Sequence, residues 1–286
     1  MQVPRAKLIL ILLLIGVLRQ SASAWTGEAG LVQRALANEL RAASDSQHPM
    51  CYHLRKTSPR LTTTKAICET ADGAVARLIA VNDAPLSTAD EAREQGRLDQ
   101  LLSDPGKQRH RKQSQDSDTA RALKVLRSLP NAFVYEYAGA GQVSSGSVEK
   151  FRFKPNPKFD PPDMETQVLT QMTGELWIDP AQERVTRLDG RLRQDVDFGW
   201  GILGRLYKGG TVVIEQADVG DHQWRVVHFD MKMSARVVFK TRVFDTAEDE
   251  SQFVSVPAGI RYQQAIAMLR GTETKVKRRR SEFAGK

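Results

Sequence analysis

The sequence predicts an α+β fold in which several helices cover a large curved antiparallel sheet, an open half-barrel of about ten strands. Two observations predict it. Apolar residues recur at helical spacing in the first half of the chain, whereas period-two alternation follows in strand after strand of the second half. Parallel strands would instead give continuous apolar runs separated by crossover helices, and this pattern is not seen in the sequence.

The N-terminal residues 1–24 predict a signal peptide. Arg5 and Lys7 precede an apolar run over 8–17, and Ala22-Ser23-Ala24 carries the small residues after which a leader peptidase cleaves. The run is too short for an ordinary membrane-spanning helix, which needs about 20 apolar residues. We therefore expect an exported protein, periplasmic or extracellular, whose mature chain begins at Trp25. An uncleaved anchor is the alternative.

The helix-rich first half has recognisable element boundaries. Leu31, Val32, Ala35, Leu36 and Leu40 predict an amphipathic helix over 28–43. A hairpin over 50–70 and a strand over 74–81 follow, and Ser87 is placed to cap a second helix that ends before Pro105. The charged stretch 103–118 is predicted as a loop, and 118–129 as a third helix.

The two cysteines are expected to form a disulfide. A symmetric hairpin centred between Pro59 and Arg60 places Cys51 directly opposite Cys68, and an exported protein allows both to oxidise. Two buried free thiols are the alternative, because a shift of one residue in register would put them on opposite faces.

The second half predicts a meander over 132–245 with one helix over 164–172. Its clearest strand is 186–198, where Leu188 and Leu192 alternate with Arg191 and Arg193. The same alternation recurs in 227–233 and 237–243. Such strands bury one face and expose the other, so we expect a concave apolar face closed by helices within a single domain over 25–270.

The net charge of +8 does not indicate nucleic-acid binding, because the charge lies at the two ends of the chain. The tail over 271–286 contains Lys275, Lys277 and Arg278-Arg279-Arg280 and is predicted to be disordered. We expect a solvated end; contact with an anionic membrane surface is the alternative.

The residues that imitate catalytic motifs lie in the wrong context. Gly199, Gly201 and Gly204 spell a dinucleotide fingerprint, but between antiparallel strands and without the crossover helix that it needs. His222 and His228 are about 20 Å apart on one strand, too far to hold one metal ion. We therefore expect no catalytic residues, no metal and no cofactor, and predict a protein that is not an enzyme.

The segment Gly174-Glu-Leu-Trp-Ile-Asp179, with its turn over 180–183 and the return strand 185–192, resembles the bacterial lipoprotein-carrier superfamily, the LolA/LolB-like proteins. The resemblance covers about 132–245 and is at the level of the fold. It implies an open antiparallel half-barrel with a helical lid over an apolar cavity that takes acyl chains. The hairpin over 50–70 and the charged helix over 87–103 depart from that pattern.

Two functions are therefore expected. The first is a binding or carrier protein of the cell envelope for a lipid, lipoprotein or other amphiphile, with an apolar flap over 199–210 at the mouth of its cavity. The second is a structural or interaction protein whose core is closed by its helices. The candidate wall residues are Phe151, Phe153, Leu188, Leu192, Phe229, Met231, Met233 and Phe239, and the candidate flap residues are Trp200, Ile202 and Leu203.

Overall fold

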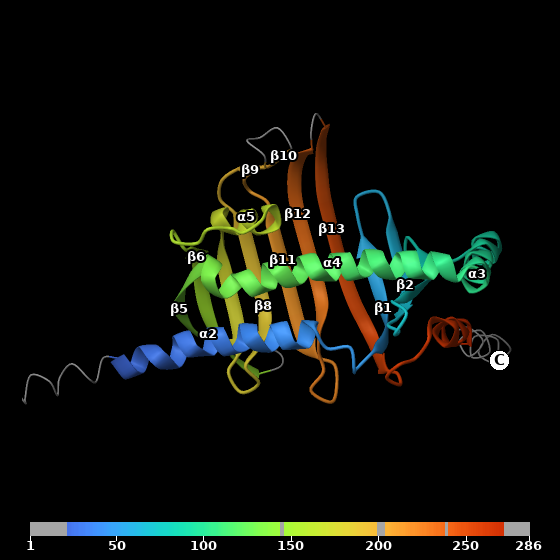
Figure 1. Ribbon diagram of the computed structural model, residues 1–286, viewed down its shortest axis with the longest axis horizontal. Helices are drawn as coiled ribbons and strands as arrows, with labels where there is room; N and C mark the ends of the chain where they lie inside the picture. The colour runs from blue at the N-terminus through green and yellow to red at the C-terminus, as the bar shows by residue number, and fades with distance from the viewer. Residues whose placement is uncertain (1–21, 144–145, 199–203, 238–239, 272–286) are drawn as a thin grey trace, which may run out of the picture.

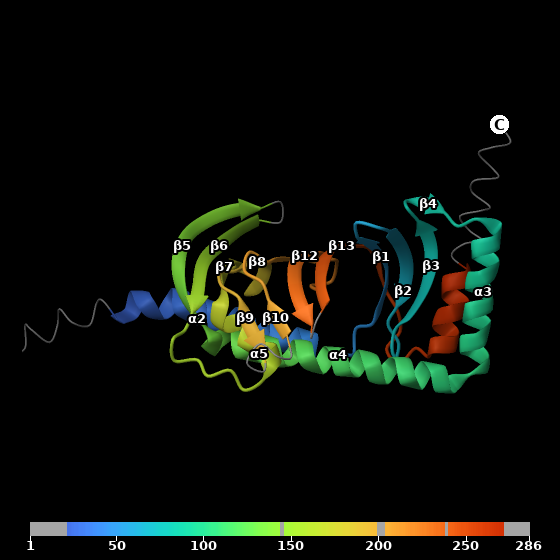
Figure 2. The same cartoon turned by 90° about the horizontal axis from the view of Figure 1, so that it is seen from above.

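The computed structural model describes residues 22–143, 146–198, 204–237 and 240–271. Its centre is one antiparallel sheet with the strand order β4-β3-β2-β1-β13-β12-β11-β8-β7-β6-β5, to which β10 and β9 are added beside β12. The two ends of this order do not pair, so the sheet is open, and Figure 2 shows it bending at β5 and β6. The expected open half-barrel with helices is confirmed.

The strands follow the predicted pattern, and the N-terminal hairpin joins the same sheet because β1 pairs with β13. Their bounds are β1 Met50–Thr57, β2 Thr62–Cys68, β3 Val75–Val81, β4 Ala84–Pro85, β5 Phe133–Val143, β6 Gly146–Pro155, β7 Met172–Asp179, β8 Arg184–Leu192, β9 Val196–Phe198, β10 Gly204–Leu206, β11 Thr211–Asp218, β12 Trp224–Val237 and β13 Lys240–Ser255.

Two long helices, α2 (Ala22–Ala43) and α4 (Pro105–Ala132), lie on one side of the sheet (Figures 1 and 2). The apolar stripe predicted for the first helix is buried there, as Val32, Ala35 and Leu36 show. They pack with Leu129 and Ala132 of α4 onto side chains of β6, β7 and β8. The predicted helix over 164–172 is present as α5 (Met164–Gln167) and the 3-10 turn η1 (Val168–Gln171). We call this side of the sheet the apolar face.

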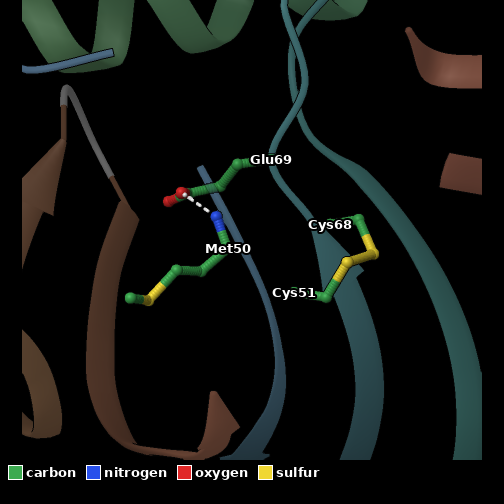
Figure 3. The surroundings of a disulfide bond; sticks show 4 residues. All are labelled: Met50, Cys51, Cys68 and Glu69. Carbon is green, nitrogen blue, oxygen red and sulfur yellow. Dashed lines mark hydrogen bonds between the residues drawn. A yellow bond between two sulfur atoms is a disulfide. The ribbon is translucent and has the colours of Figure 1, made fainter. Parts of the chain in front are cut away.

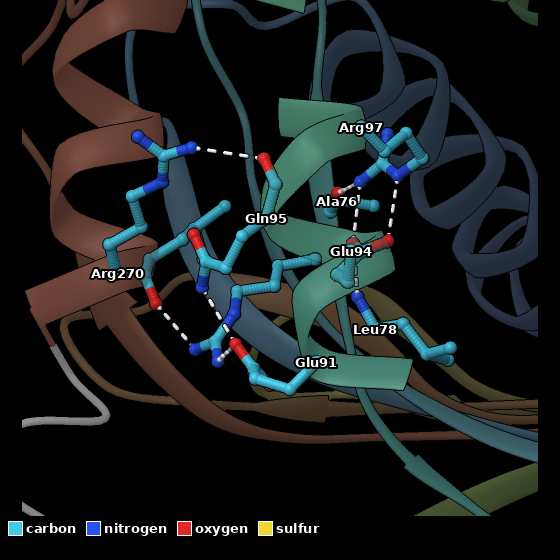
Figure 4. Close-up of polar contacts among 9 residues, drawn as sticks. Ala76, Leu78, Glu91, Glu94, Gln95, Arg97 and Arg270 are labelled. Atoms are coloured by element: carbon cyan, nitrogen blue, oxygen red, sulfur yellow. Dashed lines mark hydrogen bonds and ion pairs between the residues drawn. The ribbon is translucent and has the colours of Figure 1, made fainter. Parts of the chain in front are cut away.

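A second core forms on the opposite side of β1, β2 and β3. There α3 (Thr88–Ser103), capped by Ser87 as predicted, buries Leu98 and Leu101 together with a helix over 262–271. Figure 4 shows how α3 is tied to β3: Glu94 accepts the Leu78 N–H at 2.8 Å, and Arg97 donates to Glu94 and to the Ala76 carbonyl. The helix over 262–271, which the sequence interpretation missed, completes this core.

The predicted disulfide joins Cys51 of β1 to Cys68 of β2 (Figure 3). The register is the predicted one, with Cys51 opposite Cys68 and Thr57 opposite Thr62. Beside it, the N–H of Met50 donates to Glu69 at 2.9 Å. The bond covalently closes the hairpin at the end that leads to α2.

The predictions of a loop over 103–118 and a separate helix over 118–129 are wrong. The whole stretch is one helix, α4, because the Asp104 side chain accepts the N–H groups of Gly106 and Lys107 and Pro105 occupies the first turn, where its missing donor costs nothing. The stretch resembles a loop in sequence because it has no apolar stripe. Ion pairs at helical spacing, such as Lys112 with Asp116, occupy its surface instead.

The predicted single strand over 186–198 is also wrong, since it divides into β8 and β9. After Leu192 the backbone leaves the ladder: the N–H of Arg193 donates to the Gln171 carbonyl at 2.9 Å, and Asp195 accepts the Lys208 N–H at 2.8 Å. The alternation within β8 is as expected, because Leu192 is buried and Arg191 is exposed.

Candidate binding face

A row of directly opposed residues crosses the apolar face from β6 to β1. It runs from Phe151 through Leu176, Leu188, Ile214 and Phe229 to Glu248 and Lys56. Opposed residues of antiparallel strands point to the same side of a sheet. The row therefore starts in the core under α2 and α4 and ends beyond it.

The candidate wall residues divide between these two regions. Phe151, Phe153 and Leu192 are at most 4% exposed. Phe151 and Phe153 belong to a closed core, against which Leu188 and Met233 pack. Phe229 and Met231 are half-buried and lie outside that core cluster. Phe239 and the flap candidates Trp200, Ile202 and Leu203 lie outside the described residues.

The helix α4 passes over the part of the sheet around Phe229 and Met231 without packing closely on it. Its C-terminal part packs against α2 and α5, and its N-terminal part is held by Gln108 and Gln115, which bond to the backbone of 72–74. Every residue from Asp116 to Ala122 is exposed. Since this segment is nearly two helical turns long, the side that faces the sheet is exposed as well. Figure 1 shows α4 crossing in front of β12, β13 and β1, and Figure 2 shows it running along one side of them.

The floor below this segment combines apolar and aromatic groups. Phe229 and Met231 of β12 are followed across β13 by Leu54 and Tyr52 of β1, all half-buried. The ring of Tyr52 stacks on that of Phe253 with centroids 5.5 Å apart. We call the floor the open face; its members are Tyr52, Leu54, Phe229, Met231, Thr246, Glu248, Glu250 and Phe253.

Carboxylates border the open face on the side of β1 and β13. Glu248 pairs with Lys56 at 2.6 Å, and Glu69 lies 3.5 Å from Arg225. Burial raises the pKa of Glu250 to about 7, an effect strengthened by Glu248 and Glu69 and opposed by Arg225. Burial and then the charge of Glu250 raise the pKa of Tyr52 above its usual range.

The other side of β12 and β13 is wet. His228 pairs with Asp249 at 2.7 Å there, as the alternation over 227–233 predicts. The alternation over 237–243, which predicts Val243 on the buried face, is wrong at that residue: Val243 lies opposite Ser234 on the wet side and is 72% exposed. On this side β12 carries His228, Asp230, Lys232 and Ser234, and the core under α2 and α4 lies on the opposite side.

Three clefts in the described part of the chain are lined mainly by charged and polar residues. The largest of these three, about 520 Å³, lies between the end of α2 and the start of β12 and is lined by residues that include Arg41, Arg184 and Trp224. A second, about 360 Å³, includes Phe153 beside Arg152 and Arg193, and a third, about 310 Å³, lies between α3 and α4. Of the wall candidates, only Phe153 contributes to any of these three clefts.

The sequence interpretation missed Tyr52, Leu54, Glu250 and Phe253. Tyr52 and Leu54 do alternate with His53 and Arg55, so the apolar side of β1 could have been recognised. The neighbourhood of β1 and β13, which are nearly 200 positions apart, has no signal in a single sequence.

Among the described residues no helix is both long enough and apolar enough to cross a membrane. No protein-family model matches the chain, and no curated protein matches it.

Solved structures that are similar to this chain include the following three. A proposed outer membrane lipoprotein-sorting protein domain from Vibrio parahaemolyticus is 10% identical with a TM-score of 0.31, over 80% of this chain and 94% of that one. A DUF1329 family protein from Desulfovibrio piger is 11% identical with a TM-score of 0.28, over 78% and 91%. MucB, in its complex with MucA(peri), is 11% identical with a TM-score of 0.21, over 76% and 93%. The first is described as a lipoprotein-sorting domain, and the sequence segment 174–192 resembles that kind of protein.

Proposed function

We propose that this protein is an exported binding protein that holds an amphiphile on its open face and catalyses no reaction. One observation carries the proposal: the apolar row continues from the closed core to half-exposed side chains below a helix that does not pack on them. Adaptable Met and aromatic side chains are typical of surfaces that take apolar ligands. The disulfide and the leader-like N-terminus support an extracytoplasmic location.

The competing function is a structural or interaction protein without a ligand. The burial of Phe151, Phe153 and Leu192 favours it for the covered part of the sheet, because a filled core leaves no room for an acyl chain there. The cavity expected at those three residues is therefore not part of our proposal, which concerns Phe229 and Met231 instead.

A neutral fluorescent probe, N-phenyl-1-naphthylamine, tests the proposal. We expect saturable binding with a rise in fluorescence at a stoichiometry of one. Met231→Trp should weaken binding at least several-fold by filling the open face, while its melting temperature stays near that of the wild type. Val243→Trp, which adds the same ring on the wet side of β13, should bind like the wild type.

The result that contradicts the proposal is equally clear. If the wild type does not bind the probe and Met231→Trp loses about 1–3 kcal/mol of stability through overpacking, the face is closed and the structural function is correct.

A further inference from the structure

Glu250 is a charged group on the open face without a partner. It lies in β13 directly opposite Leu54 of β1 and two positions after Glu248, on the side of the sheet that carries Phe229. Within the described residues it makes no hydrogen bond and no ion pair, although it is half-buried. Its carboxylate is the one on this floor that the protein leaves unmatched.

The other charges nearby are already matched. Lys56 bonds to Glu248 at 2.6 Å, Arg225 lies 3.5 Å from Glu69, and Glu69 also accepts the Met50 N–H at 2.9 Å. These ion pairs thus match Glu248 and Glu69 and leave Glu250 unmatched among the described residues. Lys65, which lies opposite Leu54 on β2, is exposed and forms no ion pair with Glu250. A half-buried carboxylate without a counter-charge is costly, so a cation that arrives with a ligand would be bound favourably.

The immediate surroundings of Glu250 suit an organic cation. The stacked rings of Tyr52 and Phe253 lie on the same side of the sheet, and aromatic faces attract ammonium groups. The Tyr52 hydroxyl has no hydrogen-bond partner within the described ranges and can accept from an ammonium N–H. Phe229 and Met231 continue the floor toward the core, where an alkyl chain would lie.

From this arrangement we propose that the ligand of the open face is an alkylammonium amphiphile, whose cationic head binds Glu250 beside Tyr52 and Phe253 and whose chain lies on Phe229 and Met231. The proposal rests on the proposed function and names its ligand class. Fatty acids and phosphate-headed lipids fit less well, because their heads would face Glu250, Glu248 and Glu69.

A polypeptide is a poorer fit than an alkyl chain. At Phe229, Glu248 and Leu54 the strands β12, β13 and β1 are paired on both sides, and the edge of β13 that β1 leaves unpaired, at 240–246, lies beyond the end of β1. A ligand on the open face therefore contacts side chains and not backbone groups. The apolar side chains suit a chain of methylene groups, and Glu250 suits a charged end.

The test is displacement of N-phenyl-1-naphthylamine by three ligands of equal chain length: dodecylammonium, dodecanol and dodecanoate, each below its micelle concentration, at pH 8 and low salt. We expect dodecylammonium to bind about tenfold more tightly than dodecanol, and dodecanoate to bind most weakly. Glu250→Gln should reduce the advantage of the ammonium to about twofold or less and leave dodecanol unchanged. The matched control, Asp245→Asn, removes a carboxylate from the wet side of the same strand and should keep the wild-type order.

The outcomes separate the two proposals. Failure of the wild type to bind the probe overturns the proposed function together with this inference. If the probe binds but dodecanol and dodecylammonium displace it equally, or if Glu250→Gln preserves the order, the proposed function stands and the cationic ligand is wrong. If a basic amphipathic peptide displaces the probe more tightly than dodecylammonium, the ligand is a polypeptide and the inference is overturned.

Discussion

At the scale of single residues, the sharpest contrast lies between neighbours in β8. Leu192 is 1% exposed and Arg191 points to solvent. Leu192→Asp should lose several kcal/mol, because a carboxylate enters apolar surroundings without a partner. Arg191→Asp should change the free energy of unfolding by less than about 1 kcal/mol. Urea denaturation of both variants measures the difference, and similar losses would contradict the assigned faces.

Glu250 gives the stability a defined pH dependence. Its pKa is about 7 in the folded protein against 4.5 as the ordinary value. The folded state therefore holds the proton more strongly, so this residue favours folding below pH 4.5, and that contribution is lost as the pH rises through about 7.

The Gln variant measures this contribution. Glu250→Gln should gain stability relative to the wild type between pH 4.5 and 8, on the order of 1–3 kcal/mol, since the amide does not ionise. Melting temperatures of both proteins across this range provide the check. A difference between them that is independent of pH would mean that Glu250 titrates as in water.

At the scale of elements, the β1–β2 hairpin was predictable in detail. The turn residues fix the centre of the hairpin, and the register then places Cys51 opposite Cys68 without further information. Replacing both cysteines by alanine should cost about 3 kcal/mol, because the bond closes a short loop. Intact mass after alkylation without reductant tests the bond itself. Alkylated cysteines in exported protein would contradict it.

The helix α4 was predictable at its start and not in its middle. Asp104 is the N-cap of α4 and Pro105 lies in its first turn, and both residues are typical of a helix start. The sequence nevertheless predicts a loop over 103–118, because the residues that follow have no apolar stripe. Apolar periodicity indicates which side of a helix is buried. A helical segment that is exposed on all sides, such as 116–122, has no apolar periodicity and cannot be recognised in this way.

A pair of substitutions at Ser114 tests the continuity of α4. In an exposed helix interior Ser114→Ala should be about 1 kcal/mol more stable than Ser114→Gly. In a loop the two variants would differ little. Thermal denaturation distinguishes these outcomes, and equal stabilities of the two variants would favour the loop that the sequence predicts over 103–118.

At the scale of the whole molecule, the alternation in β8 and β12 predicts the apolar face, but not which part of it is covered. Coverage depends on where α2 and α4 end, and on the pairing of β1 with β13, both set by tertiary contacts. The helix over 262–271 is a different case. Tyr262, Ala265, Ile266 and Leu269 have helical spacing in the sequence, so that element was available and was missed.

The central claim is that the open face holds an amphiphile, and native mass spectrometry tests it most directly. The protein would be purified without detergent from the extracytoplasmic fraction of the cells that make it, and sprayed under gentle and then activating conditions. We expect a population heavier than the chain by the mass of one small amphiphile, which is released on activation and is reduced in Met231→Trp. A bare chain mass under all conditions, with no amphiphile in an organic extract of the same sample, would contradict the account.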